Sequence, residues 1–85
     1  MNKDKKKELY SVSIIIYNDN ERIKILKNIE KHFHGPNWGM YYGSKIILDE
    51  TYQITVENSK QCYALNVFKL LCLYKDKEVK ITKIV

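Results

Sequence analysis

An apolar run near the end of the chain constrains the fold more than any other feature. Residues 62–74 contain only two plainly polar side chains, Asn66 and Lys69. The leucine, alanine, glutamine and lysine in this part of the chain favour a helix, although no glycine ends it. A helix of this composition is apolar almost all the way round, which a surface helix over one small core does not need to be. We therefore expect a helix whose burial determines the remaining architecture.

Length and composition indicate one soluble domain. The chain has 85 residues, of which 45% are hydrophobic and 29% charged, and its apolar runs are far shorter than the ~20 residues of a membrane helix. We expect residues 1–8 to form a flexible basic tail and residues 9–85 to form a single domain. No small-residue cleavage site follows the first apolar stretch, so we expect no signal peptide, a cytoplasmic protein and no membrane association.

The two cysteines predict a reducing compartment. Cys62 and Cys72 both fall inside the apolar run. On one helix they would lie about 15 Å apart, whereas a disulfide requires Cα atoms within roughly 7 Å. We expect both to be free, buried thiols.

A strand and a helix open the predicted domain. Residues 10–17 alternate, which predicts a half-buried strand with inward Tyr10, Val12, Ile14 and Ile16. Asn18 is a good helix cap, and Glu21 stands three residues later as in a capping box. The helix should end near Phe33, before Gly35 and Pro36. Its apolar side consists of Ile23, Ile25, Leu26, Ile29 and Phe33.

Three further strands complete the prediction. Residues 40–48 and 52–57 should form a hairpin in which Tyr52, Ile54 and Val56 face inward. Opposed residues share a face of a sheet, so we expect Ile46 opposite Ile54 and Leu48 opposite Tyr52, with a loop of residues 49–51. Asn58 and Ser59 should cap the second helix. The last strand covers residues 79–85, with Val79 and Ile81 inward.

The order β-α-β-β-α-β predicts an α+β fold of the ferredoxin-like type, with an antiparallel sheet in the order 4-1-3-2. The alternative treats residues 61–74 as a strand and gives a β-α-β-β-β-β sheet with one helix. In the favoured fold the outward residues of the two central strands include no aromatic side chain at the centre of the face, where such sheets stack RNA bases; Tyr17 and Tyr41 lie at strand ends or on the edge. Those outward residues are Ser11, Ser13, Ile15, Tyr17, Gln53, Thr55 and Glu57.

Catalytic and metal sites find little support in the sequence. There is no glycine-rich phosphate loop and no Gly-x-Ser-x-Gly motif. His32 and His34 would point about 200° apart on a helix, so we expect no metal and no cofactor. Asp19 is the one acid that a metal-dependent nuclease of this fold could use, but a helix N-terminus explains it more simply. We expect no enzymatic activity.

Two surfaces are candidates for binding. Projection of the apolar run on a helix gives a core stripe of Ala64, Leu65, Phe68, Leu71 and Cys72. A second stripe with the spacing of a helix-packing seam, joined by an aromatic residue of the helix-ending loop, predicts a protein or homodimer interface. This interface comprises Tyr63, Val67, Leu70, Tyr74 and Trp38. The alternative is nucleic-acid binding, which the net charge of +5 favours. The predicted binding residues are Lys24, Lys27, Lys31 and Arg22.

These features favour a small non-enzymatic interaction protein. The basic residues are nearly all lysine, and abundant Lys, Ile, Asn and Tyr are typical of AT-rich coding DNA, which is common in phages and mobile elements. We therefore expect a regulator or inhibitor of the anti-defence (anti-CRISPR) type that acts on a nucleic-acid-handling complex. A basic DNA- or RNA-binding protein is the alternative.

Overall fold

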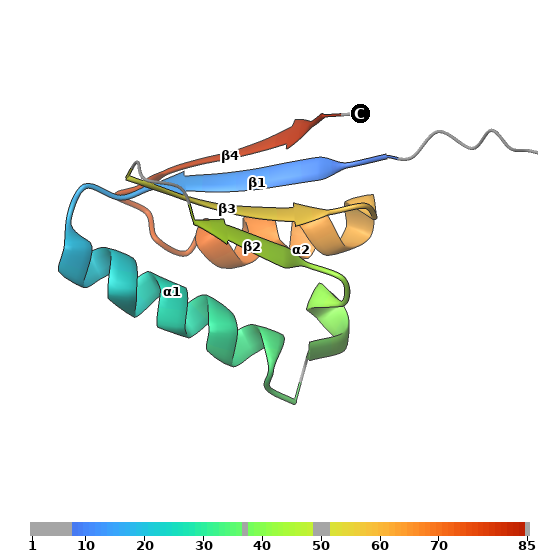
Figure 1. Ribbon diagram of the computed structural model, residues 1–85, viewed down its shortest axis with the longest axis horizontal. Coiled ribbons are helices and arrows are strands. Elements are labelled where there is room, and N and C mark those ends of the chain that lie inside the picture. Colours follow the sequence, from blue (N-terminus) through green and yellow to red (C-terminus); the bar gives the residue numbers. More distant parts are fainter. Residues whose placement is uncertain (1–7, 37, 49–51, 85) are drawn as a thin grey trace, which may run out of the picture.

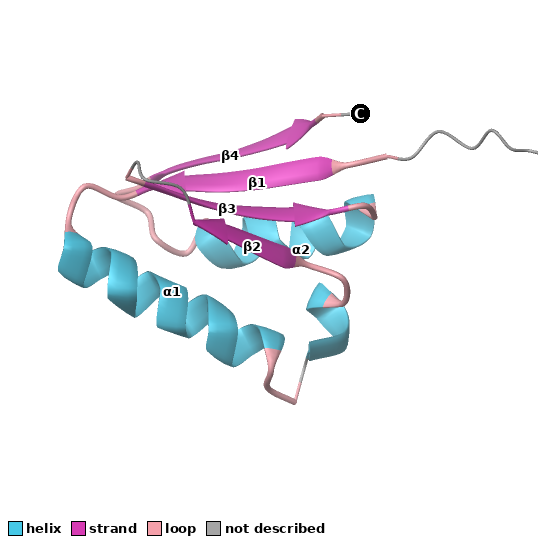
Figure 2. Ribbon diagram, in the orientation of Figure 1, coloured by secondary structure: helices cyan, strands magenta, loops and turns pink. Residues whose placement is uncertain are grey.

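The computed structural model describes residues 8–36, 38–48 and 52–84. These residues form two α-helices, a short 3-10 helix and four strands; Figure 2 draws the helices in cyan and the strands in magenta. In chain order these are β1 (Tyr10–Ile15), α1 (Asp19–Phe33), η1 (Trp38–Tyr41), β2 (Lys45–Leu48), β3 (Gln53–Asn58), α2 (Gln61–Leu71) and β4 (Glu78–Lys83). Apart from Glu8, the predicted tail lies outside the described residues.

The sheet confirms the expected fold class. Its strands run in the order β2-β3-β1-β4, which is 4-1-3-2 from the other edge, and every neighbouring pair is antiparallel. Both helices contribute to one continuous core on one side of this sheet (Figure 1). The domain is therefore a small α+β fold of the ferredoxin-like type, and the one-helix alternative is excluded because Gln61–Leu71 is helical.

The alternation of the first strand determines the centre of the core. Tyr10, Val12, Ile14 and Ile16 are buried as expected. In the register of the sheet, Val12 lies opposite Val56 and Ile14 opposite Ile54. Fully burying an Ile or Val side chain stabilises the fold by roughly 1.5–3 kcal/mol, so these pairs account for much of its stability. Val79 and Ile81 pack against the edge of this core, also as predicted.

Helix α1 begins at the expected cap. The side chain of Asn18 accepts hydrogen bonds from the backbone N–H groups of Asn20 (2.8 Å) and Glu21 (3.2 Å). The carboxylate of Glu21, expected to complete a capping box, instead binds Lys77. Ile25 and Ile29 are buried, whereas Ile23 is 52% exposed and lies outside the core, so its assignment to the apolar side was wrong.

The hairpin differs from its prediction in two ways. Residues 40–44 are not strand, because Tyr41 ends the 3-10 helix and Gly43 turns the chain with a φ of 79°. The register is shifted by two residues, which preserves the inward face: Ile46 lies opposite Val56 and Leu48 opposite Ile54. The pairing of β2 with β3 therefore ends at Leu48 and Ile54. Tyr52 lies beyond this last pair and is 55% exposed instead of inward. The predicted loop of residues 49–51 lies outside the described residues.

Helix α2 is present but rotated from the expected orientation. Its buried residues are Ala64, Val67, Leu70 and Leu71. In the predicted core stripe, Ala64 and Leu71 are buried and Phe68 packs against the core, but Leu65 is 39% exposed and Cys72 is exposed. Cys62 and Cys72 are free but exposed, so the predicted burial of the thiols was wrong. The displacement is one residue, or about 100° of helix rotation. Both stripes are apolar, so periodicity could not distinguish them.

The start of α2 also differs from its prediction. Asn58 belongs to β3, and the helix N-cap is Lys60, whose side chain makes no capping bond. Asn58 instead accepts a hydrogen bond from the backbone N–H of Lys60 through its side chain (2.8 Å). This amide therefore links the end of β3 to the first turn of α2.

Candidate protein-binding surface

The segment between α1 and β2 is held in a defined conformation at its start. Gly35 follows the end of α1, and a Cβ atom there would lie 2.8 Å from the backbone oxygen of Lys31. Only glycine fits this close approach without movement of the backbone. The N–H of Trp38 then donates to the carbonyl oxygen of Gly35 (3.1 Å), and η1 begins.

Tyr41 anchors the segment in the core. Its side chain is 8% exposed. The ring stacks on Phe33 of α1, with 5.2 Å between ring centroids, and the ring of His32 lies edge-on to it at 6.2 Å. Aromatic pairs in these geometries contribute about 0.5–1.5 kcal/mol beyond their buried area. One side chain of η1 is thus fixed inside the domain, which leaves its neighbours facing outward.

Two amide side chains hold the backbone beside this anchor. Asn58, only 3% exposed, donates from Nδ2 to the carbonyl oxygen of Tyr42 (2.9 Å) and to Oγ of Ser44 (3.0 Å). Asn66 of α2 donates from Nδ2 to the carbonyl oxygen of Met40 (2.7 Å). A buried polar group left without a partner costs about 1–3 kcal/mol, so the bonds of Asn58 strongly favour this one backbone conformation.

A continuous group of exposed large side chains lies on this supported backbone. Trp38, Met40 and Tyr42 are 52%, 48% and 60% exposed. The Tyr42 ring lies 5.7 Å from that of Trp38 and 6.4 Å from that of Tyr63 on α2. Figure 1 shows η1 beside the end of α2 at which that helix begins. We call the exposed Trp38, Met40 and Tyr42, together with the partly buried Tyr63, the aromatic surface.

The ring geometry favours contact with protein over base stacking. Trp38 and Tyr42 are tilted by 53°, and Tyr42 meets Tyr63 at 66°, close to edge-on. Each ring covers part of its neighbour's face, whereas single-stranded nucleic acids stack on open ring faces. Packed Trp and Tyr side chains with polar tips are instead typical of protein interfaces, where a few such residues supply most of the binding energy.

The structure separates the five predicted interface residues. Trp38 and Tyr63 both belong to the aromatic surface, joined by Tyr42, which the sequence analysis placed in a strand. Val67 and Leu70 are 0% and 5% exposed, so they belong to the core and not to a surface stripe. The hydroxyl of Tyr74 accepts a hydrogen bond from Nδ2 of Asn28 (2.7 Å) and so links α1 to the loop that follows α2. A signal for Tyr42 was available, since it lies only four residues after Trp38, between Gly39 and Gly43.

The predicted nucleic-acid-binding residues lie along α1. Lys24, Lys27 and Lys31 are exposed, and none of them belongs to an ion pair between described residues. Their spacings of three and four residues place them on one side of the helix. Arg22 is only partly exposed. The three lysines therefore form a row on the side of the helix that faces solvent.

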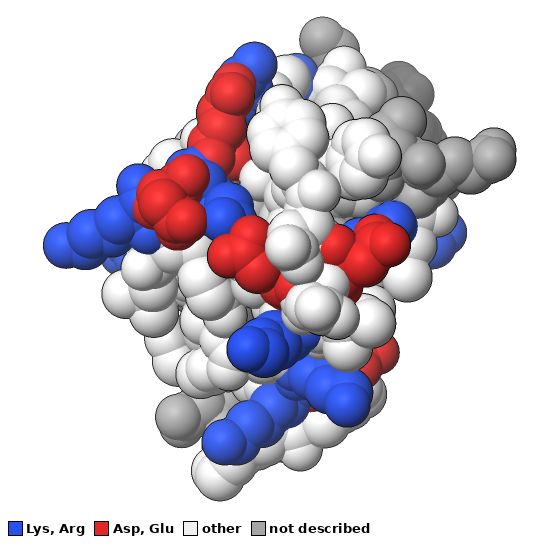
Figure 3. All heavy atoms as spheres, turned by 90° about the vertical axis from the view of Figure 1, so that its left-hand side faces the viewer, with Lys and Arg blue, Asp and Glu red and all other residues white. Residues whose placement is uncertain are grey.

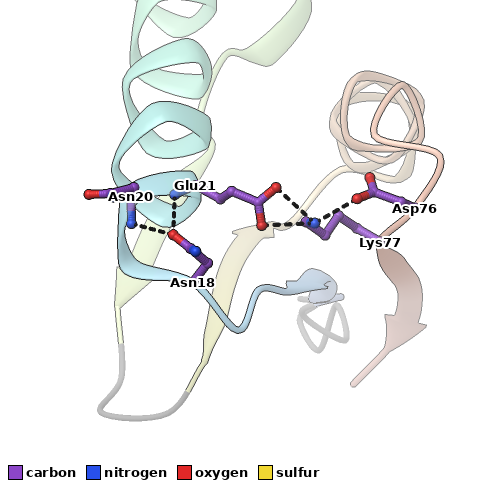
Figure 4. A network of polar contacts seen from close by, with 5 residues as sticks. All are labelled: Asn18, Asn20, Glu21, Asp76 and Lys77. Atoms are coloured by element: carbon purple, nitrogen blue, oxygen red, sulfur yellow. Dashed lines mark hydrogen bonds and ion pairs between the residues drawn. The ribbon is translucent and has the colours of Figure 1, made fainter.

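The N-terminal end of α1 carries both acidic and basic side chains. Lys77, with a side chain 12% exposed, donates to Asp76 (2.8 Å) and to Glu21 (3.0 Å) and so connects the first turn of α1 to the loop before β4 (Figure 4). The hydrogen bond from Lys77 lowers the pKa of Asp76, and the bonds to Asp76 and then Glu21 raise the pKa of Lys77. Acidic and basic side chains alternate on this end of the molecule (Figure 3). The network is a structural link between elements.

The remaining predicted sites stay isolated. Asp19 lies exposed in the first turn of α1. Within residues 8–36, 38–48 and 52–84, no three His, Cys, Asp or Glu side chains are grouped so that they could bind a metal ion. In the same part of the chain, no helix combines the length and apolar character needed to span a bilayer. Comparisons with protein-family models, curated proteins and solved structures find no match to this chain.

Proposed function

We propose that this domain is a non-enzymatic module that binds another protein through the aromatic surface. The observation that carries the proposal is the exposure of Trp38 and Tyr42, at 52% and 60%, on a backbone held by the buried amide of Asn58. Large side chains left in water on a fixed support are what a binding hot spot requires. Because the support is already formed, binding need not order it, which favours affinity.

The charges around the aromatic surface favour a different protein over a second copy. Lys60 precedes Tyr63 by three residues and is exposed, so each copy in a dimer would bring its Lys60 ammonium group to the patch. In a symmetric dimer the same patch meets itself, so these ammonium groups would approach one another. Like charges at an interface disfavour association, whereas a partner of opposite charge would gain from them. The test therefore has to distinguish a different partner protein from a second copy of this chain.

The test compares two exposed aromatic pairs in the same protein. Immobilised wild type is exposed to nuclease-treated lysate of the source cells beside two double variants, Trp38→Ala/Tyr42→Ala and Tyr17→Ala/Tyr52→Ala. The Tyr17–Tyr52 pair is a matched control, since its centroid distance is also 5.7 Å and its rings are 77% and 55% exposed. We expect a protein retained by wild type and by the Tyr17/Tyr52 variant to be lost from the Trp38/Tyr42 variant.

Two results would contradict this proposal. Equal retention by all three baits would show that the aromatic surface binds nothing. Concentration-dependent dimerisation of wild type that only the Trp38/Tyr42 change removes would replace the partner with a second copy. The prediction of a phage or mobile-element inhibitor stays a prediction, which the identity of the retained protein would decide.

The lysine row supports nucleic-acid binding as a second candidate function. Lys24, Lys27 and Lys31 are exposed and make no ion pair with described residues. If they contact phosphates, changing all three to Gln should lower the slope of log K against log salt by about two for single strands. The control changes three exposed lysines elsewhere: Lys45, Lys69 and Lys75. Equal slopes for the two triple variants would exclude the row as a phosphate-binding site.

A further inference from the structure

A pocket lies at the C-terminal end of α1, next to the aromatic surface. Its volume is about 470 Å³, and it is lined by Lys31, His32, His34, Gly35 and Pro36. The pocket exists because the helix stops here: Gly35 has no side chain to fill the space, and Pro36 directs the chain away from the helix axis. No acidic side chain is among its lining residues.

The pocket and the aromatic surface are parts of one continuous structure. The ring of His32, in the pocket wall, lies edge-on to Tyr41 of η1 at 6.2 Å. The carbonyl oxygen of Gly35, another wall residue, accepts the hydrogen bond from the N–H of Trp38. In a protein ligand that covers Trp38, the residues next to the covering side chain can therefore reach the pocket.

The chemistry of the pocket suits a carboxylate. Lys31 provides an ammonium group that makes no ion pair with any described residue, and the two imidazoles provide N–H donors. Pro36 and the methylene stem of Lys31 add apolar wall, which fits a side chain with an apolar stem and a charged end. The negative end of the α1 dipole opposes any anion here, so the Lys31 ammonium has to outweigh it; this is harder for a doubly charged phosphate than for a singly charged carboxylate. Among the described lining residues there is no arginine for bidentate phosphate binding.

We propose that this pocket binds an Asp or Glu side chain of the protein that covers the aromatic surface. The partner segment then carries an acidic residue next to an apolar or aromatic one. This inference rests on the proposed function and adds the partner's chemistry: an acidic protein segment, attracted by a chain whose net charge is +5.

The test uses a displayed library of random 12-residue peptides, selected on the immobilised full chain. We expect the recovered peptides to contain Asp or Glu beside an aromatic or aliphatic residue. The affinity of one synthetic peptide is then measured against wild type, Lys31→Ala, Lys27→Ala and Trp38→Ala. Lys27 is the matched control, because it is exposed on the same helix but does not line the pocket.

Lys31→Ala should weaken binding about fivefold, near the upper value for an exposed ion pair, and Lys27→Ala should leave it unchanged. Replacing the peptide acid by its amide should cause the same loss in wild type and no further loss in Lys31→Ala. Peptides that depend on Trp38 but lack acids and ignore Lys31→Ala would overturn the carboxylate site alone. Peptides indifferent to Trp38→Ala would contradict the proposed function itself, and preferential binding of a phosphorylated peptide would assign the pocket to phosphate.

Discussion

The side-chain amide of Asn58 donates a hydrogen bond to the carbonyl oxygen of Tyr42 across 2.9 Å, although the two residues are 16 apart in the sequence. The same side chain accepts from the N–H of Lys60, so one buried group positions the aromatic surface relative to both β3 and α2. The position of the exposed rings thus depends on a residue that no partner can touch in the folded domain.

Asn58→Ala should lower the free energy of unfolding by about 2–3 kcal/mol, because two backbone groups lose their partner in a buried site. Asn66→Ala is the control: its amide makes one hydrogen bond, to Met40, in an exposed setting, and should cost about 1 kcal/mol or less. Urea denaturation measures both values. Equal losses for the two variants would show that the buried amide has no special role.

Two of the three glycines should respond differently to alanine. Gly43→Ala should cost about 1–2 kcal/mol, because Gly43 has a φ of 79°, which L-residues adopt only with strain. Gly39→Ala is the control, since no described residue outside the local backbone comes within 4 Å of its added Cβ, and it should be neutral or stabilising by up to about 1 kcal/mol. Thermal melts of both variants test this ordering. A destabilised Gly39→Ala beside an unchanged Gly43→Ala would contradict the described turn.

The orientation of α2 predicts opposite outcomes for two pairs of substitutions. Val67→Glu with Leu70→Glu should unfold the domain, because two carboxylates in the core cost more than the roughly 5–15 kcal/mol by which small domains are stable. Leu65→Glu with Leu73→Glu should remain folded, since these side chains are 39% and 69% exposed. Circular dichroism distinguishes the cases. A folded Val67/Leu70 variant would restore the sequence-based interface.

The hydrogen bond between Lys77 and Asp76 should make the free energy of unfolding depend on pH in the acid range. The hydrogen bond from Lys77 holds the pKa of Asp76 below its ordinary value of 3.8, so its contribution is present above that value and is lost as the pH falls through the folded pKa. Asp76→Asn should therefore melt below wild type at neutral pH, and the difference should close in acid. The pKa of Lys77 is raised above 10.5, so its contribution persists in neutral solution and is lost only at higher pH.

A double-mutant comparison provides the control. In a Lys77→Met background, Asp76→Asn should have no comparable effect on the melting temperature between neutral pH and pH 3, because the bonding partner is gone. A pH-dependent difference that survives in that background would assign the effect to another group.

Local patterns explain which parts of the fold were predictable. The alternation of β1 and the cap at Asn18 are short-range signals, and both elements have the expected faces and start. The hairpin register depends on where the turn closes, and a shift of two residues leaves the alternation of both strands unchanged, so patterning cannot detect it. Only the backbone pairing, with Ile46 opposite Val56 and Leu48 opposite Ile54, reveals it.

The candidate site was predictable only in part, for a different reason. Trp38 and Tyr63 stood out as interface residues, but their connection requires Tyr42 to leave the strand in which alternation placed it. The burial of Tyr41 against Phe33 causes that departure, and it is a tertiary contact with no local signal. Val67 and Leu70 were misassigned because α2 is apolar on two faces, and only the sheet decides which face is inside.

The residues that would recognise a partner are not the residues that hold the turn in place. Trp38 and Tyr42 project from a backbone secured by Asn58, Asn66 and Tyr41. Substitution of the outward side chains should therefore leave the scaffold intact, so new binding specificities could be selected at these positions without refolding the domain. The turn between α1 and β2 is therefore a fixed support on which different recognition residues can be placed.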